Sequence, residues 1–166
     1  MDIKQLSDKH PLYSRLTGQV IWVLFEENDA EQDDIDTFMD LCLKRKERDL
    51  QVMQTLLDNP SLYLKVQIED IPCLSGSEGC CKTKHPDLPP PCECCVALDG
   101  RVLPASHPEL LKYLPPYGLG CRCTPKAVTA AEAADAPPLT DASLPLRKLH
   151  CDSGWLFHMH WKEQSA

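Results

Sequence analysis

The chain has 166 residues, of which 43% are apolar, which suits one domain of ordinary size or a small domain with an added subdomain. The longest apolar run, Val20–Phe25, has six residues, too few to cross a membrane, and the polar N-terminus shows no signal peptide, so we expect a cytoplasmic protein. The net charge is −8, of which −7 falls in residues 1–70, and this argues against a nucleic-acid-binding protein.

Residues 1–60 are predicted to be helical, because only one of the fifteen prolines precedes Pro60. A first helix is expected from Pro11 to about Glu27, with a strand as the alternative for its β-branched end. A second helix is expected from about Ala30 to Leu57 and ends at Asn59-Pro60. Its apolar positions repeat at helical spacing and are Ile35, Phe38, Met39, Cys42, Leu50, Met53, Leu56 and Leu57. Two such helices most simply form an antiparallel hairpin.

The remainder divides into three predicted segments. Residues 61–125 form an irregular module rich in proline and cysteine, which opens with a short strand over Leu62–Glu69. Residues 126–145 are an Ala/Pro-rich linker with a short helix near Ala127–Ala136. The aromatic tail, residues 146–166, is expected to pack back on the body. The predicted fold class is therefore a small α+β protein.

Nine of the ten cysteines lie after residue 70, and in a reducing compartment such clustering indicates metal ligands more often than disulfides. Cys92 and Cys95 form a C-x-x-C pair, a spacing that lets two thiolates reach one metal from a tight turn. Cys121 and Cys123 follow after 25 intervening residues. Zinc suits four such ligands because it prefers tetrahedral coordination by soft or borderline donors. We therefore predict a zinc site made by Cys92, Cys95, Cys121 and Cys123.

Other ligand sets remain open at this point. Cys94, His107 or another histidine could replace one of the four cysteines. A second site could form from Cys73, Cys80, Cys81 and His85. The tail histidines could contribute as well, and these are His150, His158 and His160. Disulfides or unbound thiols are the alternative to any metal site.

The cysteines do not form a recognisable catalytic set. The chain contains no H-E-x-x-H motif and no P-loop. Pro91-Cys92 to Cys95 matches half of the zinc deaminase signature, but the required His-x-Glu does not precede it. A site closed by four thiolates also leaves no position for water. A structural zinc in a protein without enzymatic activity is therefore the favoured interpretation.

Three blocks within Cys92–Cys123 resemble the C-terminal signature of the phage Mu F-like head morphogenesis (minor head protein) family. They are Cys92-x-x-Cys95, then Ala97-Leu-Asp-Gly-Arg-Val102, then Leu114-Pro-Pro-Tyr-Gly-Leu-Gly-Cys-Arg-Cys123, and they span 32 of 166 residues. Asp99-Gly100 is a strong turn signal between Val96–Leu98 and Arg101–Leu103, which predicts a short β-hairpin.

The resemblance implies a phage or prophage protein that acts through protein–protein contacts in head assembly, with portal or capsid proteins as partners. Its place would be the bacterial host cytoplasm or the virion. Two other functions remain open, a toxin-like effector enzyme with an unrecognised site and a zinc-containing regulatory protein.

Overall fold

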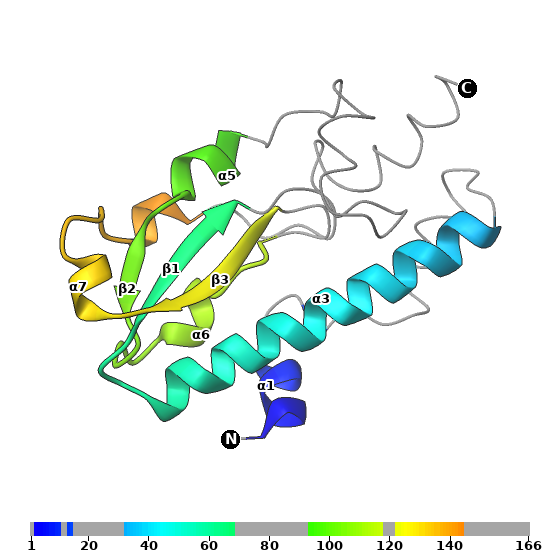
Figure 1. Ribbon diagram of the computed structural model, residues 1–166, viewed down its shortest axis with the longest axis horizontal. Helices are drawn as coiled ribbons and strands as arrows, with labels where there is room; N and C mark the ends of the chain where they lie inside the picture. The colour runs from blue at the N-terminus through cyan, green and yellow to red at the C-terminus, as the bar shows by residue number, and fades with distance from the viewer. Residues whose placement is uncertain (1, 11–12, 15–31, 69–92, 118–121, 145–166) are drawn as a thin grey trace.

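The computed structural model describes residues 2–10, 13–14, 32–68, 93–117 and 122–144. Within them, three strands and several helices form a mixed α+β fold, which confirms the predicted fold class at this level (Figure 1). The strands are β1 (Tyr63–Ile68), β2 (Val102–Pro104) and β3 (Cys123–Val128). The helical elements are α1 (Ile3–Lys9), α3 (Gln32–Asp58), α5 (Glu93–Leu98), α6 (Leu110–Tyr113), α7 (Ala130–Ala133) and the 3-10 turn η1 (Asp141–Ser143).

The long helix α3 confirms the helix predicted from about Ala30 to Leu57. It has 27 residues and buries Leu50, Met53 and Leu56, the second half of the predicted apolar stripe. It ends at Asp58, and the Asn59 side chain donates a hydrogen bond to the Thr55 carbonyl at 2.8 Å, which caps the last turn before Pro60. The side chains of residues 32–42 lie outside the description, and Cys42, one of the predicted apolar positions, is among them.

The helix α1 was not among the predicted elements. Asp2 accepts a hydrogen bond from the Gln5 backbone N–H at 2.8 Å, and the Gln5 side chain accepts one from the Asp2 N–H at 3.1 Å. This reciprocal capping stabilises a helix of only seven residues, whose Leu6 is buried. Of the helix expected from Pro11 to about Glu27, only Tyr13 and Ser14 are described, and they form a turn. The rest of that helix, and hence the helical hairpin, lies outside the described residues.

The sheet has the order β2-β1-β3, and both neighbours run antiparallel to β1. The predicted strand over Leu62–Glu69 is confirmed as β1, which places Leu64 and Val66 in the core. α3 packs on β3, and α1 packs on α3 (Figure 1). One apolar cluster joins Leu6 and Met53 from residues 1–60 to Leu64 from the following segment. Each fully buried apolar side chain of this size stabilises the fold by roughly 1.5–3 kcal/mol.

The predicted β-hairpin around Asp99-Gly100 is wrong, because Val96–Leu98 belong to helix α5 and β2 pairs with β1 instead. Cys95 and Leu98 are buried and Val96 is 59% exposed, so the apolar face repeats every three residues and not every two. The turn itself is present, and Gly100 has a φ of +80°, a conformation that glycine adopts without strain.

Part of the segment expected as a linker belongs to the folded body. Lys126, Ala127 and Val128 complete β3, and α7 confirms the short helix predicted near Ala127–Ala136. Val102 donates its N–H to the Pro137 carbonyl at 2.9 Å and accepts a hydrogen bond from Leu139 N–H at 2.8 Å, and the Leu139 side chain is buried. This pairing covers the outer edge of β2. The aromatic tail, residues 146–166, lies outside the described residues.

Candidate functional site

Two of the four predicted zinc ligands are described, and both are buried. Cys95 lies on α5 and is 2% exposed, and Cys123 is the first residue of β3 and is 0% exposed. Cys92 and Cys121 lie outside the described residues.

Cys95 and Cys123 both belong to the region around the C-terminal end of β1. α5 packs on β1, and the turn that follows it is tied to that strand by two hydrogen bonds: Gly100 N–H donates to the Val66 carbonyl at 2.8 Å, and Ile68 N–H donates to Asp99 Oδ1 at 2.9 Å. On the other side of β1, Ile68 is the pairing partner of Cys123. We call this region, Val66–Ile68 with Cys95–Arg101 and Cys123–Thr124, the cysteine end of the sheet.

The other predicted ligands are not brought to this end by the described residues. The second set, Cys73, Cys80, Cys81 and His85, lies outside the description, as do the tail histidines His150, His158 and His160. The side chain of Cys94 is also outside it. His107 is half-buried; its Nδ1 accepts a hydrogen bond from Glu109 N–H at 3.2 Å, and its ring meets Tyr113 edge-on. Among the described residues, no three histidine, cysteine or acidic side chains are grouped as metal ligands.

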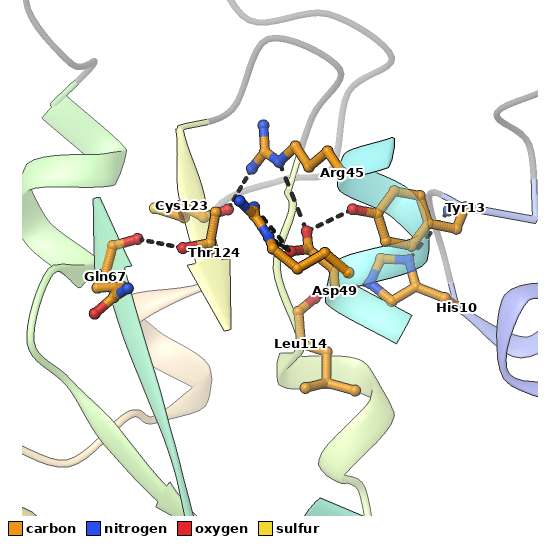
Figure 2. A network of polar contacts seen from close by, with 9 residues as sticks. His10, Tyr13, Arg45, Asp49, Gln67, Leu114, Cys123 and Thr124 are labelled. Atoms are coloured by element: carbon orange, nitrogen blue, oxygen red, sulfur yellow. Dashed lines mark hydrogen bonds and ion pairs between the residues drawn. The ribbon is translucent and has the colours of Figure 1, made fainter. Parts of the chain in front are cut away.

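A buried polar network adjoins the cysteine end, centred on Asp49 of α3 (Figure 2). The Tyr13 hydroxyl donates to Asp49 Oδ2 at 2.6 Å, and the Arg48 guanidinium donates to Oδ1 at 3.2 Å. Arg45 Nε lies 3.6 Å from Oδ2, and the same guanidinium donates a hydrogen bond of 2.6 Å to the Cys123 carbonyl. The network therefore connects the N-terminal segment, α3 and the first residue of β3.

His10 fixes the other end of this network. Its Nδ1 accepts the Tyr13 backbone N–H at 3.1 Å, so Nε2 carries the ring proton and donates to the Leu114 carbonyl at 3.0 Å. His10 is 0% exposed, and its ring lies against that of Tyr13. The two ring nitrogens of His10 therefore hold backbone groups of Tyr13 and Leu114 in place.

Burial governs the protonation of this network. Desolvation raises the pKa of Asp49 above its usual value, and the nearby Arg45, the Tyr13 hydroxyl and Arg48 only partly oppose it. Burial and the adjacent Asp49 carboxylate raise the pKa of Tyr13 well above its usual value, so the tyrosine stays a neutral donor. The network can therefore keep the charged Arg45 and Asp49 side chains paired away from water, and it can fix the position of the Cys123 backbone carbonyl.

The buried positions of Arg45 and Asp49 were not predicted, because only the apolar residues of this helix were used to predict which face it buries. The spacing contained a signal. Asp49 precedes the buried residues Met53 and Leu56 by four and seven positions, and Arg45 precedes Asp49 by four. These positions share one helix face, so an ion pair there is a buried ion pair.

Comparisons with family models, with curated proteins and with solved structures each returned no match. In the part of the chain that the structure describes, no helix is both long enough and apolar enough to span a membrane.

Proposed function

We propose that Cys92, Cys95, Cys121 and Cys123 bind one structural zinc ion at the cysteine end of the sheet. The observation that supports this most is the burial of Cys95 and Cys123 beside the same end of β1, although α5 and β3 are separated in sequence. Thiolate ligands in a water-poor site favour zinc, and four of them complete its tetrahedral coordination.

The charge balance of the region is compatible with such a site. Four thiolates around Zn²⁺ leave a net charge of −2. Two basic side chains are buried at β3: Arg122, which precedes Cys123, and Arg45, whose guanidinium donates to the Cys123 carbonyl. Buried positive charge next to a negatively charged metal centre lowers the cost of keeping it out of water.

The metal would stabilise the fold as a cross-link between separate parts of the chain. Residues 69–92 separate β1 from α5, and a metal bound by both Cys95 of α5 and Cys123 of β3 would link two elements that are far apart in the sequence. A structural zinc site of this kind contributes on the order of 10 kcal/mol to folding. The protein would then carry out its function without catalysis, by presenting a metal-stabilised surface to other proteins.

For that function we propose a role related to phage head morphogenesis, with portal or capsid proteins as partners. The three-block resemblance across Cys92–Cys123 supports it. Portal and capsid genes beside this gene, followed by copurification of the chain with the portal protein from the same genome, would test it. An adjacent immunity gene, with no binding to portal or capsid protein, would contradict it and favour an effector.

The zinc site is tested by elemental analysis of protein purified without added metal. We expect about one zinc per chain, or about two if the second cysteine set also binds, and a loss of about one zinc in Cys95→Ser and in Cys123→Ser. Val96→Ser is a matched control, because it changes the exposed neighbour of Cys95 on the same helix and leaves the thiols in place. A metal-free wild-type chain, or full zinc content in both cysteine variants, would contradict the proposed site.

A further inference from the structure

After α7 the chain turns back and runs beside β2 (Figure 1), and we call residues 137–143 the edge segment. Pro138 forms a parallel bridge with Val102. Val102 donates its N–H to the Pro137 carbonyl at 2.9 Å and accepts a hydrogen bond from Leu139 N–H at 2.8 Å. An extended ligand adds itself to the edge of a sheet by backbone contacts of this kind.

Arg101 adds a further contact to the backbone of the edge segment. Its Nη1 donates to the Pro138 carbonyl at 3.0 Å, and its Nε donates to the Ala97 carbonyl of α5 at 2.7 Å. The guanidinium is therefore oriented by a residue outside the edge segment. It presents an N–H at the place where the carbonyl of an extended chain arrives, so this part of the site is organised in advance.

Two side chains of the edge segment are recognised individually. Leu139 is 3% exposed and belongs to the main apolar cluster of the fold. Two positions later, Asp141 accepts hydrogen bonds from Lys112 Nζ at 2.6 Å and from the Tyr113 hydroxyl at 2.7 Å, both at the end of α6. Thr140, between them, is exposed. The site therefore selects an apolar residue followed two positions later by a carboxylate.

The edge segment is held less firmly than the strands of the sheet. β1 pairs with β3 along all of Tyr63–Ile68, whereas among the described residues the edge segment meets β2 at one bridge. Its acidic anchor faces water, since the side chains of Asp141 and Lys112 are 67% and 47% exposed, and salt screens such an ion pair. Ala134 and Asp135, which lead into the segment, are exposed as well. The segment can therefore leave β2 while β1 and β3 stay paired.

We propose that the outer edge of β2, with Arg101, Lys112 and Tyr113, is a binding site for an extended segment of a partner protein. Residues 137–143 occupy this site as an intramolecular ligand. The partner segment carries the same chemistry, an apolar side chain followed two positions later by a carboxylate. Displacement empties the place of Leu139 in the apolar cluster, so the edge stays open only when another apolar side chain fills it.

The tether makes the edge segment a strong competitor. A ligand on the same chain acts at a high effective concentration, so a partner binds with an apparent affinity reduced by the fraction of molecules whose site is open. Weakening the edge segment alone should therefore strengthen the binding of an external peptide. The proposal does not depend on the zinc ion, since none of its contacts involves a predicted zinc ligand.

A simpler role for the edge segment would be to cover β2 permanently against pairing with other chains. A permanent cover opens only when the whole fold unfolds, and an external peptide then has no site in the folded protein. A displaceable ligand opens locally, and a change confined to its exposed anchor increases that opening.

The test compares Asp141→Lys with Asp135→Lys in the full chain. Both variants reverse the charge of an exposed aspartate close to β2, but only Asp141 contacts Lys112 and Tyr113. The probe is a fluorescent synthetic peptide of residues 136–143, and its binding is measured by anisotropy. Hydrogen exchange of the Leu139 N–H measures how often the edge segment leaves β2.

We expect the probe to bind the Asp141→Lys chain roughly 10-fold more tightly than the wild type, and the Asp135→Lys chain within about twofold of it. The Leu139 N–H should exchange faster in Asp141→Lys alone. A probe carrying Leu139→Ala should bind Asp141→Lys at least about 10-fold more weakly.

Three results would overturn the proposal. The first is no probe binding to any of the three chains, with the Leu139 N–H exchanging only by global unfolding. The second is equal binding of the two probes, which would show that the apolar side chain is not recognised. The third is a dimer of Asp141→Lys formed by exchange of edge segments, which would assign the site to a second copy of this chain instead of a partner protein.

Discussion

Two aspartates in this protein have almost the same partners and opposite surroundings. Asp49 accepts hydrogen bonds from Tyr13 at 2.6 Å and from an arginine, and Asp141 accepts them from Tyr113 at 2.7 Å and from Lys112 at 2.6 Å. The Asp49 side chain is 1% exposed, and that of Asp141 is 67% exposed.

The pKa values of the two carboxyl groups move in opposite directions. Burial raises the pKa of Asp49, whereas the hydrogen bonds from Lys112 and Tyr113 lower that of Asp141. For these two carboxyl groups, desolvation and not the identity of the hydrogen-bond donors decides the direction of the pKa shift, and with it what each ion pair contributes to stability. Three predictions test this difference.

The largest expected effect is the loss of Asp49. Asp49→Ala leaves the buried Arg45 without its counter-charge, and breaking a buried pair in this way costs about 3–5 kcal/mol. We expect urea unfolding at pH 7 to show a loss of that size. Asp141→Ala removes the same chemical group from the surface and serves as the control, with a much smaller change. Similar losses in the two variants would show that burial does not separate them.

A smaller effect is expected from the tyrosine hydroxyls. Tyr13→Phe deprives Asp49 of its shortest hydrogen bond at a site that water does not reach, so we expect a loss of about 1–3 kcal/mol. In Tyr113→Phe, the exposed Asp141 exchanges the lost donor for water, and the change should be close to the error of the measurement. Thermal unfolding of both variants beside the wild type measures the contrast, and a larger loss in Tyr113→Phe would refute it.

The smallest effect is a difference in pH dependence. The pKa of Asp49 is higher in the folded state, so the extra stability that comes from its protonation is fully present below the unfolded value of about 3.9 and is lost as pH rises through the folded pKa. The pKa of Asp141 is lower in the folded state, so its contribution is present above that value and is lost as pH falls.

Subtracting the unfolding free energies of Asp49→Asn and Asp141→Asn from that of the wild type, between about pH 3 and pH 7, isolates each group. We expect the Asp49 difference to decline as pH rises and the Asp141 difference to decline as pH falls. Parallel curves would show that the two carboxyl groups titrate alike.

Elements were predicted correctly where the spacing of apolar residues fits only one kind of secondary structure. The prediction was wrong where the spacing fits both a strand and a helix. The helical repeat of apolar residues was sufficient to predict α3, and the partial alternation of apolar and polar residues was sufficient to predict β1. Val96–Leu98 fits a strand as well as a helix turn, and only packing against β1 leaves Val96 exposed. The capping pair Asp2 and Gln5 was a local signal for α1 that was not used.

For the candidate site, spacing predicted the cysteine ligands but not the buried polar network beside Cys123. C-x-x-C and C-R-C are local patterns, so they can be found in a sequence without a fold. The contact of Arg45 with the Cys123 carbonyl joins residues far apart in the chain and depends on the packing of α3 on β3. No local pattern encodes that packing, because it follows from the arrangement of the whole sheet.

The central place of β1 has a consequence for how the chain folds. It is the earliest of the described strands in the sequence, yet Lys65 pairs with Val102 and Ile68 with Cys123. Both partner strands follow β1 only after long stretches of chain, whose ends must come together before the strand gains its hydrogen bonds. During synthesis, β1 leaves the ribosome before either partner strand, so its backbone hydrogen bonds to β2 and β3 form only after those later strands have been made.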